Sequence, residues 1–149
     1  TNSLLFVYNM YMATLDIIML SNTINHEIYK MTQHALKTLK ESIGRKDFKI
    51  ILVETNKDLD LPYDDADILL KPGIPFNYNT YLNLAAEHCD GDYTCIVNND
   101  VNFHKDWWYK MEKAMVQHNL DTASQNLQHF KMVLFLMQKS NTDLLRKLL

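Results

Sequence analysis

Three consecutive polar residues, Asn98, Asn99 and Asp100, directly follow the apolar, strand-like run Tyr93–Val97. Mg²⁺ and Mn²⁺ take oxygen ligands and are commonly held by one or two carboxylates together with phosphate oxygens of a substrate. A carboxylate at the rigid end of a strand suits that role. The alternative is a plain turn or helix cap, because Asn and Asp are also typical of those positions.

Two other apolar runs end in the same way. The run at 15–20 is followed by Ser21 and Asn22, and the run at 48–56 ends in Glu54, Thr55 and Asn56. If the strands are parallel, their carboxyl ends lie on one edge of the sheet. Because polar ends recur at the same topological position, the pattern favours a shared binding site over three unrelated turns.

The segments between these runs predict the elements that position them. Apolar side chains recur at three- and four-residue intervals after Glu27, and Gly44 follows the last of them, which predicts a helix. Its apolar positions are Ile28, Met31, Ala35, Leu36, Leu39 and Ile43. A short strand is expected at 66–73 and a second helix at 79–89.

After the last polar cluster, Asp106 can cap a helix that carries Trp107, Met111, Ala114 and Met115. The segment 127–149 is interpreted as one or two further helices. The predicted order is β-α-β-β-α-β-α-α. Apolar strands separated by helices indicate an α/β fold with a mainly parallel, Rossmann-like sheet covered by helices on both faces.

Length and composition favour one domain over residues 1–149, with a short helical part at about 120–149. The chain is 47% hydrophobic, and its 18 acidic and 15 basic residues include no Lys/Arg run, so nucleic acid is excluded as a partner. Cys89 and Cys95 fit no disulfide framework or zinc site, which predicts buried thiols and a cytoplasmic location.

Membrane association is expected to be peripheral at most. The apolar start, 1–12, is too short to span a bilayer and has no basic leader or cleavage site. The apolar faces within 127–149 lie beside Lys and Arg residues and could touch a membrane surface, although helices that cover the core are the favoured interpretation.

Phosphate-binding loops are absent from the sequence. Among only three glycines there is no GxGxxG and no GxxxxGK[ST]. A nucleotide bound without such a loop needs its phosphate charge neutralised in another way, usually by a divalent cation. The strand-end carboxylate at position 100 is therefore the expected metal ligand.

The stretch "NLAAEHCDGDYTCIVNNDV", residues 83–101, resembles a segment of GT-A fold glycosyltransferases, particularly the family two group. There, an Asn-led helix, a Gly-Asp-Tyr turn and an apolar strand lead to a DxD or NND-type signature. A looser similarity extends over residues 14–116 through "IIMLSNT", "IILVETN" and "KPGIPFNYNTYLN".

On the metal side, the resemblance implies that Asp100 binds Mn²⁺ or Mg²⁺ bridging the diphosphate of a nucleotide sugar. Asn98 takes the first position of the signature, near the ribose or a metal-bound water, and Asn99 belongs to the same binding set. His104, four residues after Asp100, is a further candidate ligand, with a surface or capping role as the alternative.

On the base side, the resemblance implies that Glu54 contacts the nucleobase. Ser21 and Asn22 would lie beside the base, and Asn83 would help to order the loop under the ribose. Members of the family continue through an acceptor-binding half that carries the general base. Here the catalytic base is unassigned, and Asp106, Glu112 and Asp121 are candidates only by default.

The adjacent Trp107 and Trp108 are expected to divide between core and rim, since neighbouring helix positions point in different directions. The leading hypothesis is a metal-dependent glycosyltransferase that moves a sugar from a UDP- or GDP-sugar to an unknown acceptor. The alternative is a catalytically idle nucleotide-sugar-binding or interaction module of the same fold. A nucleotidyltransferase is disfavoured, because its glycine-rich, Lys/Arg-bearing phosphate loop is missing.

Overall fold

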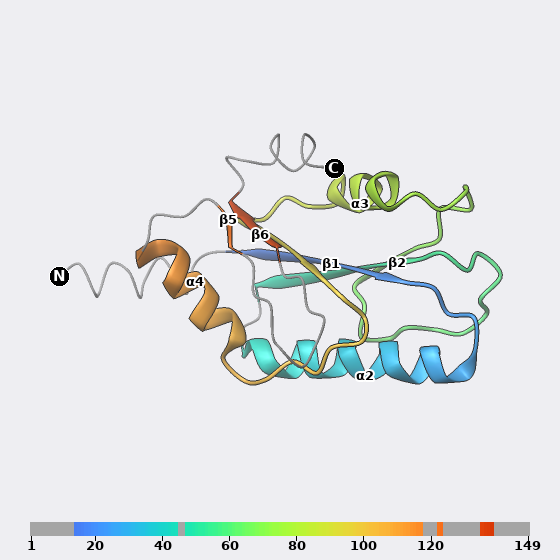
Figure 1. Cartoon of the computed structure of the whole chain (residues 1–149), viewed down its shortest axis with the longest axis horizontal. Coiled ribbons are helices and arrows are strands. Elements are labelled where there is room, and N and C mark those ends of the chain that lie inside the picture. Colours follow the sequence, from blue (N-terminus) through green and yellow to red (C-terminus); the bar gives the residue numbers. More distant parts are fainter. Residues whose placement is uncertain (1–13, 45–46, 118–121, 124–134, 139–149) are drawn as a thin grey trace.

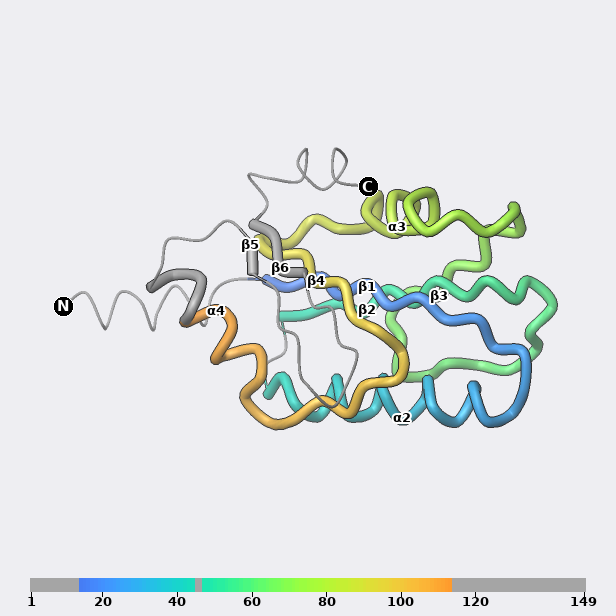
Figure 2. Tube along the Cα trace, in the orientation of Figure 1, coloured from blue at the N-terminus to red at the C-terminus, as the bar shows by residue number. Residues whose placement is uncertain are grey.

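The computed structural model describes residues 14–44, 47–117, 122–123 and 135–138. Figure 1 shows its elements and Figure 2 the path of the chain. The elements are β1 (Leu15–Ser21), α2 (His26–Ile43), β2 (Phe48–Glu54), β3 (Ile68–Leu70), α3 (Tyr78–Ala86), β4 (Tyr93–Val97), α4 (Trp107–Gln117), β5 (Thr122–Ala123) and β6 (Phe135–Gln138).

The strands form one sheet in the order β3-β2-β1-β4-β6-β5. The first four are parallel, whereas β6 is antiparallel to β4 and β5 is antiparallel to β6. In the register, Ser21 lies opposite Glu54, and Met19 lies opposite Val97. The mainly parallel sheet is confirmed, and the polar ends of β1, β2 and β4 lie at the same edge.

Helices cover both faces of the sheet, as expected. Figure 1 shows α2 and α4 on one side and α3 on the other. Because side chains alternate along a strand, Ile17 and Met19 of β1 pack in the cluster under α2 and α4, whereas Ile18 packs under α3. β1 is therefore buried on both faces, which explains its continuous apolar sequence.

Helix α2 has the expected limits but a different buried face at its start. Asn25 caps it by accepting a hydrogen bond from the Ile28 amide, and Gly44 ends it in the left-handed conformation at φ 64°. In the first two turns the buried residues are Tyr29 and Thr32, whereas Ile28 and Met31 are only half-buried. Polar contacts explain the difference, because the Tyr29 hydroxyl donates to the Pro62 carbonyl at 2.6 Å.

The helical prediction for 127–149 is wrong where the structure describes that segment. Phe135–Gln138 forms β6, and Thr122–Ala123, within the expected helical part at 120–149, forms β5. A short apolar run fits a buried strand as well as a helix, and periodicity does not distinguish them. The unpaired edge of β4 decides the outcome, because pairing with β6 satisfies its backbone groups.

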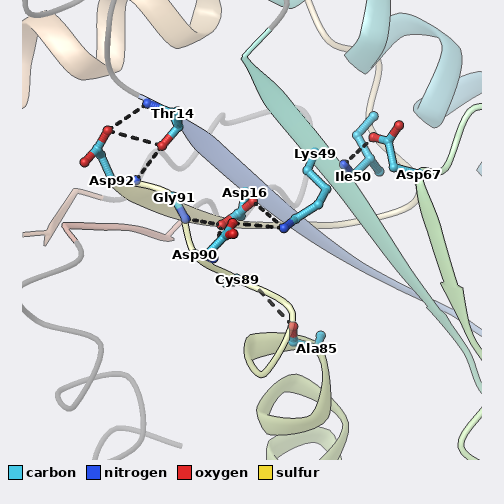
Figure 3. Close-up of polar contacts among 10 residues, drawn as sticks. All are labelled: Thr14, Asp16, Lys49, Ile50, Asp67, Ala85, Cys89, Asp90, Gly91 and Asp92. Carbon is cyan, nitrogen blue, oxygen red and sulfur yellow. Dashed lines mark hydrogen bonds and ion pairs between the residues drawn. The ribbon is translucent and has the colours of Figure 1, made fainter.

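A polar cluster at the opposite edge of the sheet fixes the turn before β4 (Figure 3). Asp16 of β1 is 3% exposed, and its Oδ2 accepts hydrogen bonds from the amides of Asp90 and Gly91 at 2.8 and 2.6 Å. Lys49 Nζ lies 3.6 Å from Asp16 Oδ1 and 3.0 Å from Asp90 Oδ1. We call Thr14, Asp16, Lys49 and residues 90–92 the amino-edge latch.

Asp92 completes the latch. Its Oδ2 accepts hydrogen bonds from the Thr14 amide at 2.9 Å and the Thr14 hydroxyl at 3.2 Å, and its own amide donates to Thr14 Oγ1 at 2.9 Å. The Gly-Asp-Tyr turn thus fixes the start of β4 against the start of β1. Residues 98–100 follow at the other end of that short strand, so the latch helps to set their position.

Candidate functional site

The polar ends of β1, β2 and β4 form one connected rim, made of residues 21–25, 54–56 and 98–100. The amide and hydroxyl of Thr55 both donate to the Ser21 carbonyl, at 2.9 and 3.0 Å. Asn56 Nδ2 donates to the Thr23 carbonyl at 2.8 Å. The loops after β1 and β2 are therefore held together as a unit.

Glu54 lies beneath the rim surface. Its side chain is fully buried, and Oε1 accepts from the amides of Thr23 and Asn56, both at 2.9 Å. Oε2 accepts from the Thr23 hydroxyl at 2.5 Å, and Tyr63 Oη lies 2.5 Å from the same hydroxyl. In this conformation the carboxylate fastens two loops, and its contact with a nucleobase stays a prediction.

Asn99 turns towards the interior. Its Nδ2 lies 3.0 Å from Thr32 Oγ1 and 3.4 Å from Ser21 Oγ, and these two hydroxyls are 3.1 Å apart. Asp100, by contrast, is exposed and Asn98 is half-buried. The signature therefore divides into an inward anchor at 99 and an exposed carboxylate at 100.

A cavity of about 340 Å³ lies between the loops after β1 and β2. Its lining residues are Thr23, Ile24, Asn25, His26, Asn56, Asp58, Leu59, Asp60 and Leu61. Ile24 and Leu61 are 72% and 44% exposed, so the cavity has apolar walls open to a ligand. Its volume falls at the small end of the range for small-molecule sites.

A family model described as "Glycosyl transferase family 2" matches residues 23–148, a range that includes the whole rim except Ser21 and Asn22. The chain belongs to glycosyl transferase family 2. No curated protein sequence matches the chain.

Solved structures with a similar fold agree with the family. A mannosyltransferase from Pyrobaculum calidifontis, in complex with GDP-Man and Mn²⁺, has a TM-score of 0.74 at 13% identity. A Desulfovibrio desulfuricans G20 protein assigned as a nucleotide-diphospho-sugar transferase has a TM-score of 0.59 at 12% identity, and TarS from S. aureus scores 0.55 at 14%. The fold is GT-A, as the sequence resemblance implied.

The family 2 chain spans only part of these proteins. The matches cover 91%, 87% and 73% of this chain but 47%, 65% and 20% of the mannosyltransferase, the Desulfovibrio protein and TarS, respectively. In the described part of the chain, no helix is long and apolar enough to cross a membrane.

The segment after the signature leads away from the rim. The Phe103 amide donates to Thr38 Oγ1 at 3.2 Å, and Trp107 Nε1 donates to Ser42 Oγ at 2.8 Å. Ser42 is ten residues beyond Thr32 on α2, which corresponds to about 15 Å along the helix axis. The chain from Asn99 to Trp107 therefore follows α2 towards the amino edge of the sheet.

The two default candidates for the catalytic base that the structure describes, Asp106 and Glu112, are not brought to the rim. Asp106 is exposed next to Trp107 and has a positive φ of 67°, and Glu112 is 2% exposed within α4. Asp121 lies outside the described residues. His104 is exposed on the same outgoing segment.

The prediction that one tryptophan lies near the rim is wrong, since Trp107 and Trp108 are 7% and 2% exposed. Trp107 reaches Ser42, and Trp108 packs edge-on against Tyr93 with ring centroids 5.3 Å apart. Asn22 is exposed at the rim. Asn83 is half-buried on α3, and its Oδ1 is buried without a hydrogen-bond partner among the described residues.

The exposed Asp100 fits a divalent ion only as a shared site. Among the residues that the structure describes, no group of three or more His, Cys, Asp or Glu side chains could hold a metal alone. A Mg²⁺ or Mn²⁺ ion at one carboxylate would need phosphate oxygens and water to complete its coordination, which is a common arrangement for these ions.

The cysteines are free thiols. Burial raises the pKa of Cys95. Burial, and to a smaller extent the negative charge of Asp16, raises the pKa of the half-buried Cys89 to about 12. Both side chains are therefore protonated near neutral pH. Neither has the thiolate character that a nucleophile or a metal ligand requires.

Sequence reasoning missed the residues that connect the rim from below, namely Thr23, Thr32 and Tyr63. Thr32 offered a weak signal, because a hydroxyl residue at 32 falls on the apolar stripe defined by Ala35, Leu36 and Leu39. A polar group on a buried helix face needs a partner, and the polar ends of nearby strands are where partners are available. Tyr63 offered no such signal.

Proposed function

We propose that the chain binds a nucleoside-diphosphate sugar together with Mn²⁺ or Mg²⁺ and transfers the sugar to an acceptor. In this proposal the nucleoside occupies the cavity between the loops after β1 and β2. Asp100 holds the metal, with Asn98 beside it, and His104 has no assigned role. The bound ion would supply Lewis-acid stabilisation of the departing diphosphate.

The chain's own residues position the donor. The buried Glu54 and the half-buried Asn56 keep the two cavity loops together through hydrogen bonds with Thr23 and with each other. Apolar Ile24 and Leu61 give a planar base surfaces against which to pack. Ser21 lies beneath the rim at 4% exposure and Asn22 is exposed on its surface, so we expect Asn22 rather than Ser21 to contact the ligand.

The observation that carries the proposal is the convergence of three strand ends on one rim, with an exposed carboxylate at one side and a cavity at the other. Family membership supports sugar transfer, and the complex of the Pyrobaculum mannosyltransferase with GDP-Man and Mn²⁺ supports this kind of ligand. The two free thiols support a reducing compartment such as the cytoplasm. The acceptor is unassigned.

Thermal unfolding with UDP- and GDP-sugars, with and without Mn²⁺, tests the proposal. A donor at about 100 times its Kd stabilises the fold by about 2.7 kcal/mol, which corresponds to a rise in Tm of roughly 5–10 °C. The rise should require Mn²⁺ and should disappear in Asp100→Ala. The matched control is Asp64→Ala, which removes an exposed carboxylate away from the signature. A metal-independent shift, or one that survives in Asp100→Ala, contradicts the site.

The second candidate function is an idle nucleotide-sugar-binding module. It is favoured by the placement of Asp106 and Glu112, since neither of these candidate bases reaches the rim. Such a module would show the Mn²⁺-dependent rise in Tm without releasing sugar from the donor. Detection of free or transferred sugar during prolonged incubation would refute it.

A further inference from the structure

We infer that Asn99 is a positioning residue whose amide donates the first hydrogen bond of a buried chain that couples the metal side of the rim to its nucleoside side. The chain runs from Asn99 through Thr32, Ser21 and Thr23 to Glu54, and we call it the hydroxyl chain. The expected effect on nucleotide binding rests on the proposed function, whereas the hydrogen bonds themselves and their effect on stability do not.

The contacts are continuous. Asn99 Nδ2 lies 3.0 Å from Thr32 Oγ1, and Thr32 Oγ1 lies 3.1 Å from Ser21 Oγ. Ser21 Oγ lies 3.2 Å from Thr23 Oγ1, which donates to Glu54 Oε2 at 2.5 Å. Every hydroxyl residue and Glu54 is at most 4% exposed, so water does not readily replace a lost link, although Thr23 Oγ1 also lies 2.5 Å from Tyr63 Oη.

The direction of the chain follows from proton counting. A hydroxyl has one proton to donate, and a carboxylate has none. Because Thr23 gives its proton to Glu54, Ser21 must donate to Thr23, and Thr32 must then donate to Ser21. Thr32 is left as an acceptor, and the Asn99 amide supplies the N–H that it accepts.

This count makes the residue type at 99 matter. The chain has four hydrogen bonds, and the Asn99 amide with three hydroxyls supplies four protons. An aspartate at 99 would place a carboxylate, which has no proton, at each end of the hydroxyl chain. The three hydroxyls alone would then supply the protons for four hydrogen bonds, so at one link two acceptors would face each other. An unmet buried polar group is costly, and the loop that carries Asp100 would lose its anchor.

The opposite hypothesis is that position 99 faces the ligand. In that case Asn99→Asp would add a carboxylate beside Asp100 and strengthen Mn²⁺ binding. Under the hydroxyl chain, the same variant should bind UDP and GDP in the presence of Mn²⁺ about tenfold more weakly. The two views therefore predict changes of opposite sign.

Unliganded stability tests the chain independently of nucleotide binding. Asn99→Asp and Thr32→Val should each lower Tm by roughly 3–8 °C, whereas Thr32→Ser, which keeps the hydroxyl, should recover most of the loss. The matched control is Asn102→Asp, the same chemical change at an exposed position three residues away. It should leave Tm within about 1 °C, as is usual for surface substitutions.

The sharpest test reverses the donor-to-acceptor direction of every hydrogen bond in the hydroxyl chain. Glu54→Gln alone presents an amide donor that can compete with the proton of Thr23, and it should be destabilising. In the double variant Asn99→Asp with Glu54→Gln, every hydrogen bond can reverse, because the new amide at position 54 donates and the new carboxylate at position 99 accepts. The double variant should therefore be more stable than the sum of the two single losses predicts.

Additive losses in the double variant, an unchanged Tm in Asn99→Asp, or tighter Mn²⁺-dependent binding by that variant would overturn the inference. Failure of the wild-type chain to bind UDP or GDP with Mn²⁺ would instead remove the proposed function. The Tm series of the unliganded variants would then still decide the hydroxyl chain.

Discussion

Gly91→Ala should destabilise the fold through the amino-edge latch. A Cβ at position 91 would lie 3.0 Å from Asp16 Oδ2 and 3.2 Å from both the carbonyl and the hydroxyl oxygen of Thr14. The Thr14 carbonyl already accepts from the Tyr93 amide at 3.1 Å, where β4 begins beside β1. None of these oxygens can retreat without weakening a hydrogen bond that holds the turn.

The expected loss of stability in Gly91→Ala has two sources, the crowding around the new Cβ and the weakening of the hydrogen bond between the Gly91 amide and the Asp16 carboxylate. Overpacking of a buried site costs typically about 1–3 kcal/mol. Retreat of the Gly91 amide from Asp16, now at 2.6 Å, would also weaken a bond to a charged group, a class worth roughly 1.5–3 kcal/mol when fully lost. Partial relaxation places the expected loss at about 1–3 kcal/mol, or a fall in Tm of roughly 3–10 °C.

Gly44 provides the comparison, because nothing lies within 4 Å of a Cβ there but its φ is 64°. Alanine at 44 should cost about 1 kcal/mol for the left-handed conformation, and asparagine should recover much of that loss. At 91 the cause is space, so asparagine should be worse than alanine. Thermal unfolding of the four variants by circular dichroism measures this. A Gly91→Ala variant within about 1 °C of wild type, or one improved by asparagine, would refute the reasoning.

Two further predictions concern titration of the same region. Burial alone would lower the pKa of Lys49, but Asp90 and Asp16 outweigh it and raise the pKa above 10.5; its contribution to stability is therefore present below about pH 10.5 and lost as the pH rises through the raised value. The Tm difference between wild type and Lys49→Met should accordingly shrink as the pH rises above about 10.5, and a constant difference would contradict the ion pairs. Since the pKa of Cys89 is about 12, alkylation by iodoacetamide of a Cys95→Ala variant should be slow at about pH 8 and accelerate up to about pH 12, whereas a rate that levels off near pH 9 would contradict the environment of Cys89.

The framework of this fold was predictable because its strands and helices have distinct periods. The continuous apolar runs of β1, β2 and β4 identify strands buried on both faces, and the polar residue after each run identifies the rim. These signals are local, so the sequence alone carries them. The same reasoning failed at 135–138, because the preference of that run for a strand depends on the free edge of β4, a partner some forty residues away in the chain.

The direction of the side chains at the rim was the second feature that the sequence alone could not predict. The three polar clusters meet at one edge of the sheet, as predicted, but sequence does not distinguish an inward side chain from an outward one where the chain leaves a strand. Asn99 and Asp100 are adjacent and chemically similar, yet one anchors to Thr32 and the other is exposed. The deciding contact comes from α2, some seventy residues earlier, which no local pattern encodes.

The two buried carboxylates on the described strands, Asp16 and Glu54, both hold turns of the chain in place. Asp16 at one edge and Glu54 at the other are at most 3% exposed, and both accept backbone amides from the turns that they hold. To turn away from the loops towards a nucleobase, the Glu54 side chain would have to release three hydrogen bonds to a charged group, each worth roughly 1.5–3 kcal/mol. A single new hydrogen bond to a base would not offset that loss. Under the proposed function, Glu54 would therefore act on a nucleoside through the loops that it holds, and the exposed Asp100 would be the acidic residue of the rim that meets a metal-bound diphosphate.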